Sequence, residues 1–168
     1  PNKIDEIVSD KIVDFDLKDL NNKKYNTKDL YKDGPILMYF WNLACEPCKK
    51  EMIFLNEFEQ KYKKYKFNII TVNMDTPRSL SKVKSYIKSK QFSFKVLNDS
   101  RSQFFRQIGG TIMPYTIMVD TLGIIKNRYS GYNFGDEIER EKEIIHILDL
   151  EHDTASCSYC RSDLANLE

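Results

Sequence analysis

The sequence predicts an α/β domain in which a central β-sheet is covered by helices on both faces. Two short, nearly unbroken apolar segments, residues 36–41 and 67–74, have the length and composition of strands buried on both faces. Amphipathic segments with helical periodicity follow each of them, and strands that alternate with helices are typical of a sheet between helical layers. The predicted order is a β-hairpin, then β-α-β-α, then β-β-α.

The predicted hairpin lies near the start of the chain. Asp14 to Leu17 alternates polar and apolar residues, Asn21-Asn22 favours a turn, and Tyr25 lies on the returning arm. Gly34-Pro35 then separates the hairpin from the buried strand at 36–41. We expect this hairpin to extend the sheet at its N-terminal side.

A long helix is predicted over residues 45–65. Pro47 lies in its first turn, where proline is tolerated because the first backbone N–H groups have no helical partner. Charged side chains fill one side of this helix and apolar side chains recur on the other. The apolar set is Met52, Phe54, Leu55, Phe58, Tyr62 and Tyr65.

The remaining elements are shorter. They are a helix at 79–90, a helix at 101–108 that ends at Gly109-Gly110, two strands at 115–119 and 124–129 joined by a hairpin turn, and an amphipathic helix at 134–150. From residue 151 onward the sequence is polar and aperiodic. We therefore predict one domain over residues 1–150 and a C-terminal tail over 151–168.

The composition is that of an ordinary globular domain. Of the 168 residues, 41% are hydrophobic and 30% are charged, and 26 basic against 25 acidic residues leave a net charge of +1. No cluster of Lys or Arg indicates a nucleic-acid partner. No apolar stretch approaches the roughly 18 residues needed to span a bilayer. Since the chain begins at Pro1 rather than Met, we expect a signal peptide or an anchor to precede it in the full protein.

The four cysteines form two Cys-x-x-Cys pairs, Cys45/Cys48 and Cys157/Cys160. Such spacing favours redox or metal chemistry over a disulfide scaffold. The first pair lies between a buried strand and a helix, so Cys45 falls at a helix N-terminus. Unpaired N–H groups and the helix dipole there favour a thiolate, the species that attacks disulfides.

Three-residue spacing on a helix brings Cys45 and Cys48 within reach of a disulfide. Cys45 is then able to attack, and Cys48 to resolve the mixed disulfide. The competing interpretations are two reduced core cysteines or half of a zinc site. Zinc requires about four ligands, and no further Cys or His lies near this pair in sequence.

The residues around the pair resemble a known family. The segment Trp41-Asn-Leu-Ala-Cys45-Glu-Pro-Cys48-Lys-Lys-Glu51, the preceding Pro35-Ile-Leu-Met-Tyr-Phe and the later Thr111-Ile-Met-Pro114 resemble the TlpA/ResA-like extracytoplasmic thioredoxins of bacteria. The resemblance covers roughly residues 12–150. It implies a thioredoxin fold, that is, three α/β/α layers with a central mixed sheet and an N-terminal hairpin extension.

The resemblance implies catalytic roles for three residues. Cys45 is the exposed nucleophile, Cys48 is the buried resolving thiol, and Glu51 matches a glutamate that ResA-type proteins keep beside the active site. Glu51 lies one helical turn after Cys48, so its carboxyl is placed to exchange protons with that thiol. Thioredoxin uses an aspartate of the preceding strand for this purpose, and Tyr39 stands at the matching position here.

Five residues are expected to contact the substrate. The resemblance implies a cis peptide bond at Pro114, with the backbone of Met113 offered to an extended substrate. It also places Trp41 beside the active site, or in the core. Glu46 and Pro47 lie between the cysteines, and the charge of Glu46 disfavours a Cys45 thiolate, which favours a reductant over an oxidant. Ala44 departs from the aromatic residue that many family members carry before the first cysteine.

The second pair, Cys157/Cys160, lies outside the resemblance. It is open to three interpretations: a second disulfide that exchanges electrons with Cys45/Cys48, a zinc site with His152 and His146, or an incidental oxidised loop. The pattern around His146 places it on the polar face of its helix, where a solvated histidine is expected.

The predicted function is that of a thiol–disulfide oxidoreductase that reduces protein disulfides outside the cytoplasm, with cytochrome c maturation as one setting. Two alternatives are a peroxiredoxin-like peroxidase and a copper- or zinc-binding protein of the same fold. A peroxiredoxin needs Thr or Ser three residues before its reactive cysteine, where Asn42 stands, and a Sco-type copper carrier uses Cys-x-x-x-Cys with a later His. A redox-inert scaffold is the non-enzymatic option.

The predicted partners follow from the same resemblance. They are a disulfide-containing protein substrate and a membrane-embedded thiol donor that returns electrons to the cysteines. We expect no cofactor, no metal at Cys45/Cys48 and no nucleic acid. The oligomeric state is open.

Overall fold

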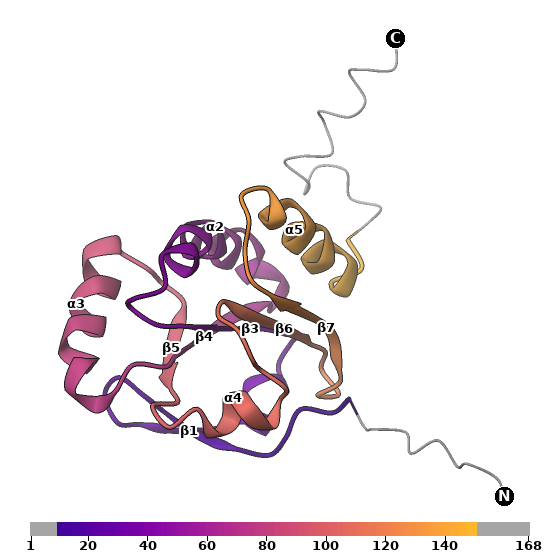
Figure 1. The fold of residues 1–168 in the computed structure, drawn as a ribbon. Helices are drawn as coiled ribbons and strands as arrows, with labels where there is room; N and C mark the ends of the chain where they lie inside the picture. The colour runs from indigo at the N-terminus through magenta and orange to yellow at the C-terminus, as the bar shows by residue number, and fades with distance from the viewer. Residues whose placement is uncertain (1–9, 151–168) are drawn as a thin grey trace, which may run out of the picture.

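The computed structural model describes residues 10–150; residues 1–9 and 151–168 lie outside the described part. Within it, one mixed sheet has the order β2-β1-β5-β4-β3-β6-β7 (Figure 1). The strands are β1 (Asp16–Asp19), β2 (Lys24–Asn26), β3 (Ile36–Trp41), β4 (Asn68–Asn73), β5 (Lys95–Asn98), β6 (Tyr115–Val119) and β7 (Ile125–Ser130). The helices are α1 (Thr27–Leu30), α2 (Glu46–Tyr62), α3 (Leu80–Lys90), α4 (Gln103–Gln107) and α5 (Asp136–Ile147), with single 3-10 turns at Lys63–Tyr65 and Pro77–Ser79.

Strand β3 lies inside the sheet with a partner on each side. It pairs in parallel with β4 and antiparallel with β6. The register sets Phe40 beside Val72 of β4 and Tyr115 of β6. The end of β3 is therefore adjacent to the end of β4 and to the start of β6. All six β3 side chains are buried, as expected for an apolar strand covered on both faces.

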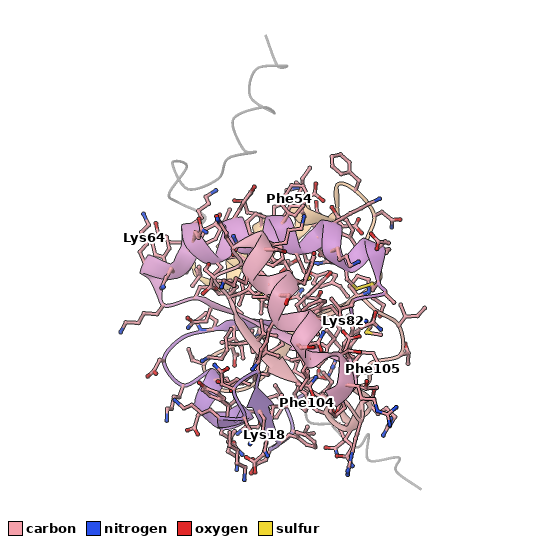
Figure 2. The ribbon with its side chains drawn as sticks, turned by 90° about the vertical axis from the view of Figure 1, so that its left-hand side faces the viewer. Lys18, Phe54, Lys64, Lys82, Phe104 and Phe105 are labelled. Carbon is pink, nitrogen blue, oxygen red and sulfur yellow. A yellow bond between two sulfur atoms is a disulfide. The ribbon has the colours of Figure 1, made fainter. Side chains whose placement is uncertain are left out.

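The two faces of the sheet carry separate apolar cores. Leu37, Tyr39 and Trp41 of β3 pack in one cluster with α2, α3 and α5, whereas Ile36, Met38 and Phe40 pack in the other with α4. Figure 2 shows Phe54 on α2 well separated from Phe104 and Phe105 on α4. The predicted three-layer thioredoxin-type architecture, with the hairpin β1–β2 at one edge of the sheet, is thus confirmed.

Two elements were not predicted. Strand β5 has four residues, of which two are buried, so its apolar pattern is too short to stand out. It is a strand because β4 and β1 pair with it on either side. Helix α1 is a single turn, capped by the Asn26 side chain, which accepts from the Lys28 N–H at 2.9 Å. The last helix was predicted to start at Phe134; it starts two residues later, and Phe134 is 89% exposed.

Among residues 10–150, no helix combines the length and the apolar character that crossing a membrane requires.

Helix α2 offers a matched test of the core. Leu55 is fully buried, whereas Ile53 on the same helix is 49% exposed. Because it leaves a cavity, Leu55→Ala is expected to lower the free energy of unfolding by about 2–5 kcal/mol. Ile53→Ala is expected to change it by no more than about 0.5 kcal/mol. Urea denaturation measures both, and equal losses would contradict this assignment of the α2 faces.

Candidate active site

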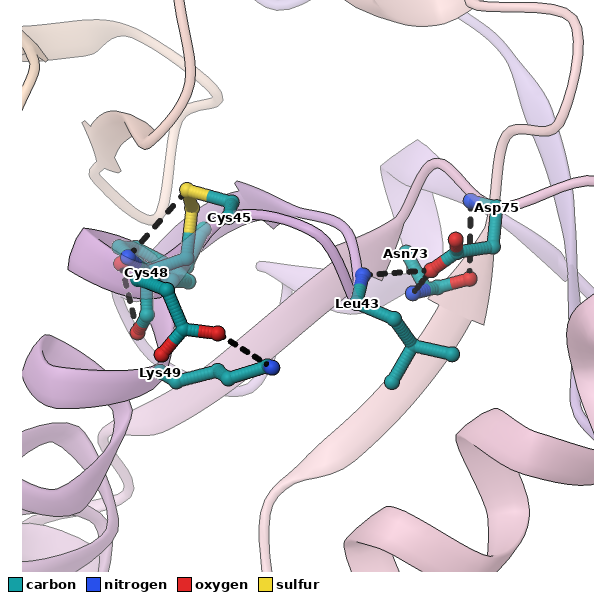
Figure 3. Close-up of a disulfide and its surroundings, with 8 residues drawn as sticks. Leu43, Cys45, Cys48, Lys49, Asn73 and Asp75 are labelled. Carbon is teal, nitrogen blue, oxygen red and sulfur yellow. Dashed lines mark hydrogen bonds and ion pairs between the residues drawn. A yellow bond between two sulfur atoms is a disulfide. The ribbon is translucent and has the colours of Figure 1, made fainter.

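The first cysteine pair lies where β3 passes into α2. Cys45 is the N-cap of α2, and its sulfur accepts from the Cys48 backbone N–H at 3.3 Å. The two cysteines form a disulfide with their Cα atoms 5.2 Å apart (Figure 3). The N–H groups of the first helical turn thus face the Cys45 sulfur, as the strand–helix position of the motif predicts.

The two sulfurs differ in their access to solvent. Cys45 is partly exposed, whereas Cys48 is fully buried. An incoming disulfide therefore has access to Cys45 and none to Cys48 in this state. This asymmetry suits one cysteine that attacks and one that resolves.

A polar network anchors the loop that leads to Cys45 (Figure 3). The Asp75 carboxylate accepts from the Leu43 N–H at 2.9 Å and from the Asn73 side-chain amide at 2.8 Å. The Asn98 amide in turn donates to the backbone carbonyls of Asn73 and Asp75. Sequence reasoning missed these residues. The available signal was polar residues directly after the buried segment at 67–72, since neighbouring parallel strands end at one edge of the sheet.

The loop before β6 brings the predicted proline to the same edge. The Met113–Pro114 peptide bond is cis, as expected. Because Tyr115 pairs with Phe40, the loop residues Met113 and Pro114 lie near the end of β3. Met113 packs against the same apolar cluster as Cys45. The prediction that Trp41 contacts substrate is wrong for this state, because full burial of β3 places the Trp41 side chain in the core against Tyr86.

A shallow groove adjoins the disulfide. It has a volume of about 560 Å³ and combines the exposed first turn of α2 with the loop before α5. Its lining residues are Glu46, Pro47, Lys50, Tyr132, Asn133 and Phe134. Glu46 pairs with Lys49 at 2.8 Å, and this hydrogen bond lowers the pKa of the Glu46 carboxyl. Phe134 was not recognised as a site residue, because its place in the sequence suggested the apolar face of a helix.

Glu51 lies beneath the disulfide and is fully buried. Its Oε1 is 3.4 Å from Nε of Arg140 on α5, and neither carboxylate oxygen has a hydrogen-bond partner among the described residues. Burial raises the pKa of Glu51 to about 7, while the Arg140 charge and the nearby Tyr39 hydroxyl act in the opposite direction. A carboxyl that titrates near neutral pH is suited to accept and return a proton.

Tyr39 occupies the strand position where thioredoxin has its aspartate. Its hydroxyl donates to the Cys48 carbonyl at 3.2 Å. Burial raises the pKa of Tyr39 well above its ordinary value, so this phenol stays protonated at neutral pH. Glu51 is thus the buried group near Cys48 that titrates in the physiological range.

The second pair and one histidine, Cys157, Cys160 and His152, lie outside the described residues. His146 is exposed on α5, as predicted. Within residues 10–150, no group of three or more His, Cys, Asp or Glu side chains is arranged to hold a metal ion.

Comparison with known proteins agrees with this site. A family model described as the AhpC/TSA family matches residues 8–128. The thiol-disulfide oxidoreductase ResA of Geobacillus kaustophilus is 30% identical over 132 residues, which are 79% of this chain and 74% of that protein. The resemblance to ResA-type proteins drawn from the motif is therefore confirmed.

Solved structures share the fold. A protein described as a thiol:disulfide interchange protein DsbE from Chlorobium tepidum has a TM-score of 0.76 at 24% identity, over 83% of this chain and 96% of that one. The peroxidoxin BcpB of Mycobacterium tuberculosis has a TM-score of 0.69 at 19% identity, over 85% and 96%. At these identities the likeness shows the fold alone.

The buried Glu51 carboxyl predicts a pH-dependent stability. The folded protein holds this proton up to about pH 7, whereas the unfolded chain releases it near the ordinary pKa of 4.5. The stabilisation from this group is thus complete below pH 4.5 and is lost as the pH rises to about 7. Relative to Glu51→Gln, the oxidised parent should lose about 3 kcal/mol of unfolding free energy between pH 4 and pH 8. Denaturation of both proteins across this range measures the difference, and parallel pH curves would contradict it.

Proposed function

Because the chain belongs to the AhpC/TSA family and is a thiol–disulfide oxidoreductase, we propose that it reduces disulfide bonds in proteins. In this proposal Cys45 is the nucleophile and Cys48 is the resolving thiol. The observation that carries the assignment of roles is the difference in exposure between the partly exposed Cys45 and the fully buried Cys48.

The reaction begins from the dithiol form. The Cys45 thiolate, stabilised by the N–H groups of the α2 N-terminus, attacks one sulfur of the substrate disulfide, and the other substrate sulfur leaves as a thiolate. Glu51 then takes the proton from the Cys48 thiol. The Cys48 thiolate attacks the Cys45 sulfur, which releases the second substrate thiolate and forms the Cys45–Cys48 disulfide. Two electrons pass to the substrate, and the protein is left oxidised.

Local charge supports the reducing direction. Glu46 is ionised at neutral pH and lies next to Cys45 in sequence, where its charge opposes a thiolate. A dithiol whose thiolate is less stabilised gives up its electrons more readily, as the contrast with the strongly oxidising DsbA illustrates. The helix N-terminus acts in the opposite sense, and it keeps Cys45 reactive.

The surface around Cys45 is suited to a polypeptide. Met113, held by the cis bond before Pro114, offers its backbone to an extended segment of the substrate. Glu46 and Pro47 flank the point of attack, and the exposed ring of Phe134 borders the groove beside them. We infer that a protein segment with an apolar side chain close to its disulfide is bound here.

The setting follows from the family resemblance. We propose that the protein acts outside the cytoplasm, with cytochrome c maturation as one context, and that a membrane-embedded thiol donor returns electrons to Cys45/Cys48. The peroxidase alternative is disfavoured by Asn42, which stands where a peroxiredoxin needs Thr or Ser.

The order of attack is tested by trapping. Cys48→Ser is expected to accumulate a covalent mixed disulfide with a disulfide-containing protein, because attack proceeds and resolution does not. Cys45→Ser, the matched control, is expected to accumulate none, since Cys48 is buried. Non-reducing electrophoresis and mass spectrometry measure both. Adducts on Cys48 in the Cys45→Ser protein would reverse the assignment.

The direction of electron flow is tested by the reduction potential of Cys45/Cys48. Equilibration in glutathione or dithiothreitol buffers should give a value more negative than about −230 mV, on a scale where thioredoxin lies near −270 mV and DsbA near −120 mV. A clearly higher value would indicate an oxidant or isomerase. Cys157→Ser/Cys160→Ser is measured alongside: an altered redox curve means that the second pair exchanges electrons with the first, and an unchanged curve means that it does not.

A further inference from the structure

A buried ion pair joins the active-site helix to α5. From it we propose that Arg140 is a positioning residue for the resolving step: it holds the Glu51 carboxylate one helical turn from Cys48 and leaves both carboxylate oxygens available for the Cys48 proton. This inference rests on the proposed role of Glu51 as the proton acceptor. It adds a residue that lies 89 positions away in sequence from Glu51 and outside the active-site motif.

The guanidinium group of Arg140 has little freedom. Its side chain is 5% exposed, and its central carbon is 3.5 Å from the centre of the Tyr129 ring on β7. An aromatic face at this distance attracts a cation and fixes the plane of the guanidinium group. Because α5 and β7 both constrain Arg140, its positive charge has a defined position relative to α2.

The other charged and titratable groups around Glu51 do not supply a second cation. Tyr39 faces it from β3, and Tyr132 from the loop before α5. Asp136 and Glu137 of α5 add negative charge, which disfavours a second anion, and Glu137 already accepts from the Tyr132 hydroxyl at 2.7 Å. Within the described residues, Arg140 is the cation that forms an ion pair with Glu51.

The geometry of the pair suits proton transfer. The 3.4 Å separation of Nε and Oε1 meets the distance of an ion pair, but the two atoms form no hydrogen bond. The positive charge therefore stabilises the carboxylate without occupying its lone pairs, which remain free to accept a proton. Without Arg140, desolvation would act unopposed, and Glu51 would stay protonated at neutral pH and accept nothing from Cys48.

The resolving step is observable in a single turnover. Reduced protein mixed with dithiobis-nitrobenzoate releases one thionitrobenzoate when Cys45 attacks and a second when Cys48 displaces it from Cys45. The second phase reports resolution, and its pH profile reports the group that accepts the Cys48 proton. The variants are Arg140→Met, Arg140→Lys, Glu51→Gln, the double variant Arg140→Met/Glu51→Gln, and Lys61→Met as control.

We expect Arg140→Met to move the inflection of the second phase to higher pH and to slow that phase at pH 7 about tenfold for each pH unit of displacement. Arg140→Lys should restore the parent profile in part, because it keeps the charge. In the Glu51→Gln background, Arg140→Met should have no further effect on the rate. Lys61→Met removes the other buried ion pair between α2 and α5, Lys61–Glu141, so it should lower stability without moving the inflection.

The outcomes separate the two proposals. If Glu51→Gln abolishes the inflection and Arg140→Met leaves it in place, the role of Arg140 is overturned and that of Glu51 stands. If Arg140→Met slows the second phase equally with and without Glu51, Arg140 acts only as structure and the inference is also overturned. If Glu51→Gln leaves the profile of the parent unchanged, both roles fail.

Discussion

The central position of β3 sets the geometry on which the rest of the site depends. Its six residues are buried on both faces and pair with β4 on one side and β6 on the other. A strand held in this way ends at a defined point, so the cysteines that follow it are placed against fixed neighbours. The end of β4 contributes the carboxylate that holds the incoming loop, and the start of β6 contributes the cis-proline loop.

The same burial creates an electrostatic cost at Glu51. A carboxylate enclosed between α2, β3 and α5 is disfavoured by desolvation, and the protein offsets this with one arginine rather than with a full set of hydrogen bonds. The group is left close to the balance between its charged and neutral forms. Burial of a charge is poor for stability, but near Cys48 it provides a proton acceptor that operates close to neutral pH.

Opposed local fields characterise the cysteine pair as well. The N-terminus of α2 favours a thiolate on Cys45, while the ionised Glu46 beside it has the contrary effect. A reductant needs both properties, since the nucleophile must be reactive and the dithiol must not be so stable that it retains its electrons. The exposure of Cys45 and the burial of Cys48 then set the order of the two attacks.

Local features of the chain were open to prediction from sequence. The segment before Cys45 is apolar over a strand's length, the spacing of Cys45 and Cys48 is that of one helical turn, and helical periodicity marks α2. Each depends on residues close together in sequence, so the fold class, the cysteine pair and the placement of Glu51 one turn beyond it followed from the sequence by itself. The four-residue β5 and the single turn of α1 escaped because such short elements carry too little periodic signal.

The tertiary structure alone decided the contacts between distant segments. Trp41 adjoins the motif in sequence, yet pairing of β3 on both sides places it in the core, whereas Phe134 was expected in a helix and lies exposed beside the groove. The Asp75 contact with the loop and the Arg140 contact with Glu51 join residues 32 and 89 positions apart. Periodicity and spacing determine local structure, but strand order and the packing of α5 on α2 determine which distant charges meet, because that choice depends on the free energy of the whole fold.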